Sequence, residues 1–161
     1  TAVNALEAAR YPHCFMGIND DGIPSVCQTR GNTDCHVILR GGTAPNYDEH
    51  HICLCEMLLR KRSLPINLMV DCSHGNSGHD YTRQSIVLMA LLQQIQAGNT
   101  SIRGVMLESN LEEGKQPCSS QYKLKGVSVT DACIGFHETQ TLLMSSATVL
   151  HAIKTTREQN Q

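Results

Sequence analysis

The chain has 161 residues, of which 40% are apolar and 17% are charged, and its formal net charge is −2. This balance is typical of a globular domain that is long enough to bury a core. The chain lacks the basic excess that nucleic-acid binding requires, and no apolar run reaches the roughly 18 residues of a membrane span. We therefore expect neither a nucleic acid nor a membrane as a partner.

The eight cysteines are expected to be reduced thiols. Cys14, Cys35, Cys72 and Cys133 lie in or beside apolar runs, where a free cysteine packs as a small hydrophobe. No two cysteines have the CxxC spacing of structural zinc sites. The N-terminal segment also lacks the basic and then apolar layout of a secretory signal. These features together predict a cytoplasmic protein.

Helices and strands are expected to alternate along the chain. A helix at 2–10 precedes a hairpin, in which apolar segments 12–18 and 24–29 flank a turn rich in Asp and Gly. Three strand–helix pairs follow, with a loop at 75–81 and a long polar loop at 110–127. Their strands are expected at 36–42, 66–74 and 103–110, and their helices at 48–62, 82–99 and 137–158. Apolar strands that alternate with long helices predict parallel βα units, so the fold class is α/β.

Each of the three expected strands ends in polar side chains. Arg40 closes the first, Asp71 and His74 close the second, and Glu108 closes the third, while Asp131 follows the long loop. In parallel α/β folds the carboxyl ends of the strands face a common site. The imidazole of His74 and the carboxylates of Glu108 and Asp131 form a plausible ligand set for Mn²⁺, Fe²⁺, Co²⁺ or Zn²⁺.

Arg40 stands beside Gly41 and Gly42, a pattern that suits an anion. A guanidinium binds phosphate or carboxylate bidentately, and glycines let the backbone approach the anion. Structural interpretations stay open at this point. His74 could be a hydrogen-bonded structural residue, the carboxylates could cap helices, and Arg40 could form an ion pair. Three consecutive strands that end in this way nevertheless favour a site for an anion and a metal.

The same segments resemble the C-terminal half of the class I 3-deoxy-D-arabino-heptulosonate 7-phosphate synthases. The matching stretches keep the family's order and nearly its spacing over about 150 residues, which is far more specific than one short motif. They are PHCF (12–15), GNTDCHVILRGG (31–42), PNYDEHH (45–51), MVDCSHGNS (69–77), QQIQAGN (93–99), GVMLESNLEEGKQ (104–116) and GVSVTDACIGF (126–136).

The resemblance implies an enzyme that condenses phosphoenolpyruvate with erythrose 4-phosphate, the first step toward the aromatic amino acids. It implies that Arg40, with Gly41 and Gly42, binds phosphoenolpyruvate. Through the motifs around them, His74, Glu108 and Asp131 would be metal ligands. His74 and Asp71 are the predicted catalytic residues. Such enzymes form dimers or tetramers, so a homo-oligomer is expected.

The resemblance also implies a (β/α)8 barrel, of which residues 1–161 would form one C-terminal segment with three barrel strands and a hairpin insert. The N-terminal half would be absent, together with the family's fourth metal ligand and several basic substrate-binding residues. A complementing N-terminal half is therefore an expected partner. Phe15 of the hairpin would contribute to an effector pocket, whereas Gly17 replaces a frequent serine and argues against inhibition by phenylalanine or tyrosine. The alternative is a non-catalytic truncated relative that binds a metal or anion or serves as an interaction module.

Overall fold

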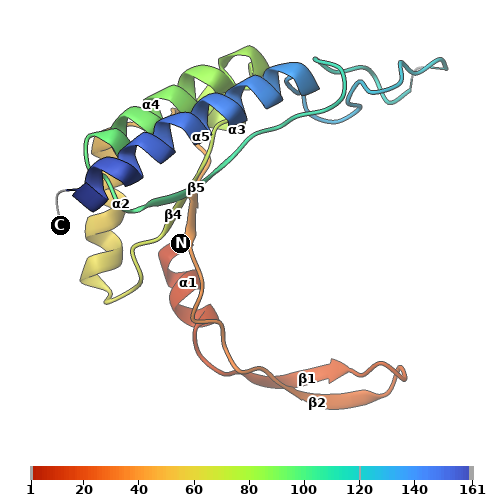
Figure 1. Cartoon of the computed structure of the whole chain (residues 1–161). Coiled ribbons are helices and arrows are strands. Elements are labelled where there is room, and N and C mark those ends of the chain that lie inside the picture. The colour runs from red at the N-terminus through yellow and green to blue at the C-terminus, as the bar shows by residue number, and fades with distance from the viewer. Residues whose placement is uncertain (1, 120, 160–161) are drawn as a thin grey trace.

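The computed structural model describes residues 2–119 and 121–159. Helices and strands alternate over most of this part of the chain, as Figure 1 shows. The helices are α1 (Ala2–Ala9), α2 (Glu49–Lys61), α3 (His74–Ser77), α4 (Gln84–Gln96) and α5 (Phe136–Gln159), with a 3-10 helix η1 (Tyr81–Arg83). The strands are β1 (Cys14–Ile18), β2 (Pro24–Gln28), β3 (Val37–Leu39), β4 (Leu68–Asp71) and β5 (Ile102–Met106).

Strands β3, β4 and β5 form a parallel sheet in that order, and β1 pairs with β2 as a separate antiparallel hairpin. The predicted α/β class and the predicted parallel βα units are therefore confirmed. Figure 1 shows helices α2, α4 and α5 on one side of the sheet, while the hairpin and the segment after β5 extend on the other side. The helix-covered side holds the core, and the opposite side is open.

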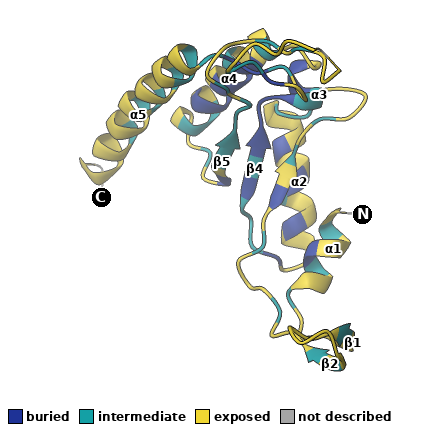
Figure 2. Ribbon diagram, turned by 90° about the vertical axis from the view of Figure 1, so that its right-hand side faces the viewer, coloured by how far each residue is buried: buried dark blue, intermediate teal, exposed yellow. Residues whose placement is uncertain are grey.

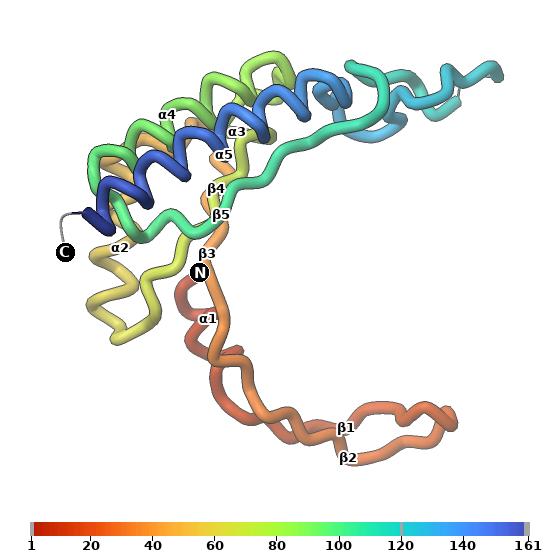
Figure 3. The backbone as a smooth tube through the Cα atoms, viewed as in Figure 1, coloured from red at the N-terminus to blue at the C-terminus, as the bar shows by residue number. Residues whose placement is uncertain are grey.

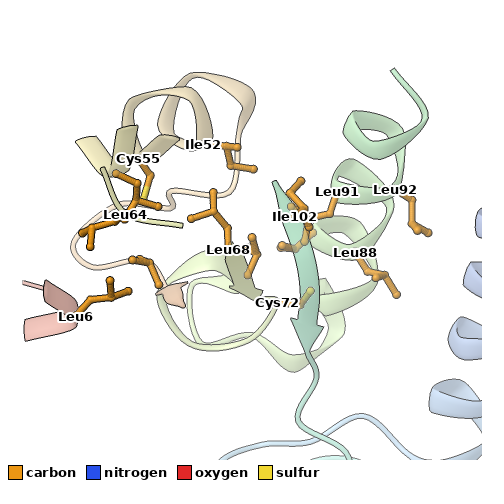
Figure 4. Packing of buried hydrophobic residues seen from close by; sticks show 14 residues of the cluster. Leu6, Ile52, Cys55, Leu64, Leu68, Cys72, Leu88, Leu91, Leu92 and Ile102 are labelled. Atoms are coloured by element: carbon orange, nitrogen blue, oxygen red, sulfur yellow. The ribbon is translucent and has the colours of Figure 1, made fainter. Parts of the chain in front are cut away.

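The core lies between the sheet and helices α2 and α4. Leu68 of β4 and Ile102 of β5 pack between Ile52 of α2 and Leu91 of α4, as Figure 4 shows. Leu59 of α2 is fully buried, like Leu68 and Leu91. These helices present apolar residues to the sheet at a spacing of three or four positions, which places them on one face of each helix.

Helix α2 begins where its sequence predicts. The side chain of Asp48 accepts a hydrogen bond from the backbone N–H of His51, at 3.1 Å, and so caps the first turn. Arg60 and Lys61 lie in the last turn, where positive charge complements the helix dipole. Cys53 is exposed and Cys55 is buried, as their spacing of two residues on a helix requires.

The hairpin stands apart from the main core, as the tube in Figure 3 shows. Phe15, Met16, Ile18 and Val26 are all more than half exposed on its two faces. The expectation that Cys14 packs as a core residue is wrong, because no second layer covers this two-stranded sheet. Cys72 and Cys133 are buried as expected. All eight cysteines lie among the described residues and none of them forms a disulfide.

The loop predicted at 75–81 is partly helical. His74–Ser77 forms the short helix α3, which Gly78 ends in the left-handed conformation at φ 68°. The side chain of Asp80 then accepts from the N–H of Thr82 and caps the 3-10 helix η1. The prediction failed because these turns are too short to leave a periodic pattern. Helix α4 consequently begins at Gln84, two residues later than expected.

The polar segment after β5 is irregular, as predicted, but it is tied to the sheet. Ser109 and Ile134 form an isolated parallel bridge, and Gly114 and Cys133 an antiparallel one. The segment before α5 therefore runs beside the extension of β5.

None of the helices in the described part of the chain combines the length and the apolar composition of a membrane-spanning helix.

Replacing Leu59 with alanine is expected to destabilise the fold by about 2–5 kcal/mol, because a fully buried leucine leaves a cavity. Leu58→Ala is the matched control in the same helix, since Leu58 is 55% exposed. Urea unfolding followed by circular dichroism measures both variants. Equal losses of stability in the two variants would contradict the described packing of α2.

Candidate metal and anion site at the sheet edge

The carboxyl ends of β4 and β5 lie at one edge of the sheet. Asp71 pairs in register with Met106, and Leu39 pairs with Val70. Figure 2 shows the arrows of β4 and β5 pointing toward the end where α3 lies. The polar residues that follow each strand therefore gather at this edge, as the parallel order dictates.

His74 begins helix α3 and is held by Asp71. Its Nδ1 lies 2.7 Å from Oδ2 of Asp71. Asp71 is buried, with 3% of its surface exposed. A carboxylate accepts but does not donate, so Nδ1 carries the proton and Nε2 is left with its lone pair. The backbone of His74 has a φ of 40°, an uncommon value for a residue with a β-carbon.

Glu108 is fixed at both its side chain and its backbone. Ser73 Oγ donates to Oε2 of Glu108 at 2.8 Å, which leaves Oε1 directed at His74. The distance from Oε1 to Nε2 of His74 is 3.6 Å, too long for a hydrogen bond. The side-chain amide of Gln84 meanwhile bonds both the N–H and the C=O of Glu108.

Asp131 completes a group of three potential ligands. One ligand atom from each of His74, Glu108 and Asp131 lies within 4.8 Å of the other two. Ligands at about 2.1 Å from one ion in tetrahedral geometry are about 3.4 Å apart, so these atoms would need to approach one another by up to about 1.4 Å. His74 and Glu108 are partly buried, and Asp131 is exposed. Imidazole nitrogen with two carboxylates suits a divalent transition metal, so the residues present fit such an ion.

A buried asparagine ties the neighbouring strand ends together. Nδ2 of Asn76 donates to the carbonyl oxygens of Leu39, at 3.0 Å, and Asp71, at 2.8 Å. Its Oδ1 accepts from the N–H of Asn46, and Oδ1 of Asn46 accepts from the N–H of Gly41, both at 2.8 Å. The turn after β3 and the turn after β4 are therefore one hydrogen-bonded unit.

Two glycines permit this close approach. A β-carbon on Gly41 would lie 2.5 Å from the carbonyl carbon of Gly75, and one on Gly75 would lie 2.8 Å from that of Gly41. Gly41 also has a φ of 73°, which side chains rarely adopt. The Gly41 backbone is held by the asparagine network, and Gly75 directly precedes Asn76.

Arg40 lies at the end of β3, beside the group of three ligands along the sheet edge but outside it. Its side chain is exposed, and none of the hydrogen bonds or ion pairs described for residues 2–119 and 121–159 uses its guanidinium. Gly42 is exposed, and a β-carbon there would meet no described atom within 4 Å. The guanidinium is thus available to an anion from solvent.

Sequence reasoning missed Ser73, Asn76 and Gln84. Gln84 carried a readable signal, because it shares one helical stripe with the buried Val87 and Leu91. A polar residue on an apolar stripe must find partners inside the protein. Ser73 and Asn76 had no such periodic context, since the turn that contains them is irregular.

The sequence model of the DAHP synthetase I family matches residues 1–144 of this chain. The chain belongs to the DAHP synthetase I family. It is 52% identical over 146 residues to a protein of Enterobacter agglomerans named "Phospho-2-dehydro-3-deoxyheptonate aldolase, Tyr-sensitive". The matched region covers 89% of this chain and 68% of that protein. A protein of the same name from Escherichia coli K12 is 51% identical.

A solved structure from Francisella tularensis SCHU S4, of a phospho-2-dehydro-3-deoxyheptonate aldolase, matches with a TM-score of 0.89 and 40% identity. The match covers 93% of this chain and 44% of the Francisella chain. The chain likewise spans 41% of the E. coli protein, so it corresponds to about two fifths of the length of these two relatives.

Gly75→Ala is expected to lower the free energy of unfolding by about 1–3 kcal/mol. The added methyl group would lie less than 3 Å from backbone atoms of Gly41 and Gly42. Gly42→Ala is the control, since its β-carbon would have open space. Thermal unfolding compares the two variants. If Gly75→Ala is as stable as Gly42→Ala, the close approach of the two turns is wrong.

Burial raises the pKa of the Cys72 thiol to about 12, and the adjacent carboxylate of Asp71 adds to the shift. The unfolded thiol ionises near its ordinary value of 9.0, so its contribution to stability is complete below pH 9 and is lost as the pH rises from 9 to 12. The free energy of unfolding of the wild type should fall between pH 8 and pH 10 by about 1.4 kcal/mol more than that of Cys72→Ala. Urea unfolding at both pH values measures this difference, and parallel losses would contradict it.

Proposed function

We propose that this chain carries part of the active site of a 3-deoxy-7-phosphoheptulonate synthase. Such an enzyme joins C3 of phosphoenolpyruvate to the aldehyde carbon of erythrose 4-phosphate, while water adds and phosphate leaves. The observation that carries the proposal is the convergence of His74, Glu108 and Asp131 at the sheet edge of a chain from this family. The names of the relatives support the same activity.

His74, Glu108 and Asp131 are the proposed ligands of a divalent metal, with Mn²⁺, Fe²⁺, Co²⁺ and Zn²⁺ as candidates. When bound, such an ion supplies Lewis-acid polarisation of the sugar aldehyde. Asp71 keeps the proton of His74 on Nδ1, at 2.7 Å, and so leaves Nε2 free to act as a ligand. The predicted catalytic role of Asp71 is thus better described as a positioning role, exerted through His74.

Arg40 is the proposed binding residue for the anionic groups of phosphoenolpyruvate, and Gly41 and Gly42 form the loop beside it. Its exposed guanidinium lies at the end of β3, next to the strand that leads to His74. The hydrogen bond from the Gly41 N–H to Asn46 fixes this loop relative to the metal ligands. An anion held there would be oriented against a second substrate on the metal.

We propose further that residues 1–161 form the C-terminal segment of a (β/α)8 barrel. The parallel order of β3, β4 and β5, the helices on one side and the strand-like pairing of Ser109 with Ile134 support this arrangement. Residues 2–119 and 121–159 contain only these three parallel strands, so the remaining strands of such a barrel would have to come from elsewhere. A complementing N-terminal half, or a homo-oligomer, would cover exposed apolar side chains such as Ile38, Leu143 and Met144.

The role of Phe15 in an effector pocket stays a prediction. Phe15 is 53% exposed on the hairpin, and Gly17 on the same face leaves room for the thiol of Cys27, since a β-carbon there would lie 2.5 Å from Sγ. A serine at Gly17 would displace that thiol. The cytoplasmic location likewise remains a proposal.

The second candidate function is a non-catalytic relative that keeps a metal-binding half-site. The observation in its favour is that the chain spans 41% of the E. coli protein, so a barrel built from it alone lacks most of its strands. This candidate predicts metal binding without turnover under any complementation.

The activity is tested by co-expressing the chain with the N-terminal segment of the E. coli relative that it does not cover. We expect the purified pair to consume phosphoenolpyruvate and release phosphate when erythrose 4-phosphate and Mn²⁺ are added. His74→Ala should reduce the rate at least about 100-fold, because changes to residues that merely support a metal ligand already cost up to that factor.

His151→Ala is the control, since His151 is an exposed histidine of α5 outside the group of three ligands. Turnover that is lost with His74→Ala and kept with His151→Ala supports the synthase. A stable, metal-binding pair without any turnover would instead establish the non-catalytic candidate.

A further inference from the structure

We infer that Gln84 is a positioning residue that sets the metal affinity of the site by holding the backbone of Glu108. It does so without being a ligand itself. The inference rests on the proposed metal site and adds to it a residue from helix α4.

Gln84 makes a two-point contact with one residue. Its Oε1 accepts from the N–H of Glu108 at 2.8 Å, and its Nε2 donates to the C=O of Glu108 at 3.0 Å. Strand β5 ends at Met106, so the N–H and C=O of Glu108 lie beyond the regular β-ladder. The amide of Gln84 takes the place of a neighbouring strand and satisfies both groups.

The position of Gln84 makes this contact rigid. Gln84 is the first residue of α4 and is fully buried. The following buried residues of the helix, Val87, Leu88 and Leu91, anchor it in the core. A buried amide that uses both ends of its side chain has no alternative partner without a loss of hydrogen bonds.

The contact also reaches the segment that contains Asp131. The carbonyl oxygen of Glu108 accepts a second hydrogen bond from the N–H of Ile134, at 3.0 Å, and Ile134 is fully buried. Gln84 and Ile134 therefore both donate to the backbone carbonyl of Glu108, and Ile134 lies three residues after Asp131 in the chain. Ser73 orients the Glu108 carboxylate, while Gln84 fixes the backbone from which that carboxylate extends.

The test measures the affinity of the 161-residue chain for Mn²⁺ alone, by isothermal titration calorimetry, in the wild type and in Gln84→Met. Methionine has a similar length and volume but removes both hydrogen bonds. We expect Mn²⁺ affinity to fall about 10–100-fold, as it does for other residues that support metal ligands. Gln94→Met is the matched control, because Gln94 lies in the same helix and donates one hydrogen bond, to the Tyr47 carbonyl, rather than to one of the three proposed ligand residues.

A double-mutant comparison distinguishes positioning from general destabilisation. If Gln84 acts through Glu108, then Gln84→Met should weaken Mn²⁺ binding no further in a chain that already carries Glu108→Ala. Should Gln84→Met fail to fold, Gln84→Asn replaces it, since it keeps a buried amide but is one methylene too short to bond both backbone groups of Glu108.

The outcomes separate this inference from the proposed function. A wild type that binds Mn²⁺ while the folded Gln84 variants bind it equally well would overturn the inference and leave the metal site standing. The inference would also be overturned if Gln84→Met weakened Mn²⁺ binding by the same factor in the Glu108→Ala chain as in the wild type. An equal loss of Mn²⁺ affinity in Gln94→Met would overturn it as well. A wild type that does not bind Mn²⁺ would overturn both the proposed site and the inference.

Discussion

The side chain of Asn76 is the contact on which the arrangement of the site depends. It is buried at the carboxyl edge of the sheet and bonds the ends of β3 and β4 together with the loop that leads into α2. A buried amide left without these partners would cost about 1–3 kcal/mol for each lost group, so the two turns stay in register. The close approach of Gly41 to Gly75 follows from this connection. An anion beside Arg40 and a metal beside His74 would consequently share one rigid support.

The three proposed ligands come from different parts of the chain, and two of them, His74 and Glu108, are held by neighbours that are not proposed ligands. Asp71 holds the imidazole of His74, Ser73 holds the carboxylate of Glu108, and Gln84 holds the backbone of Glu108. Ile134 connects the Asp131 segment to the same backbone. Such supporting contacts reduce the reorganisation that metal binding requires, because they fix the ligand atoms beforehand. The exposed Asp131 is the least constrained member of the set.

The sequence predicted the regular elements well because their patterns are periodic. The alternation of strands and helices along the chain corresponds to the structure. The ends of the strands also predicted which residues gather, since parallel strands bring their carboxyl ends to one edge. The bond of Asn76 to Leu39 and the contact of Gln84 with Glu108 could not be predicted, because the partners lie 37 and 24 residues away in the chain. The turn that forms α3 was missed because it is too short to leave a periodic pattern. The exposure of Cys14 was missed for a related reason, since an apolar strand is buried only when another layer covers it.

The central claim is that His74, Glu108 and Asp131 bind one divalent metal ion together. A crystal of the 161-residue chain soaked in Mn²⁺, with diffraction data collected at the manganese absorption edge, tests it most directly. The account predicts a single anomalous peak within about 2.3 Å of Nε2 of His74 and of a carboxylate oxygen from each of Glu108 and Asp131. A peak at the exposed Asp48 and His51 pair instead, with none between the three residues, would contradict it.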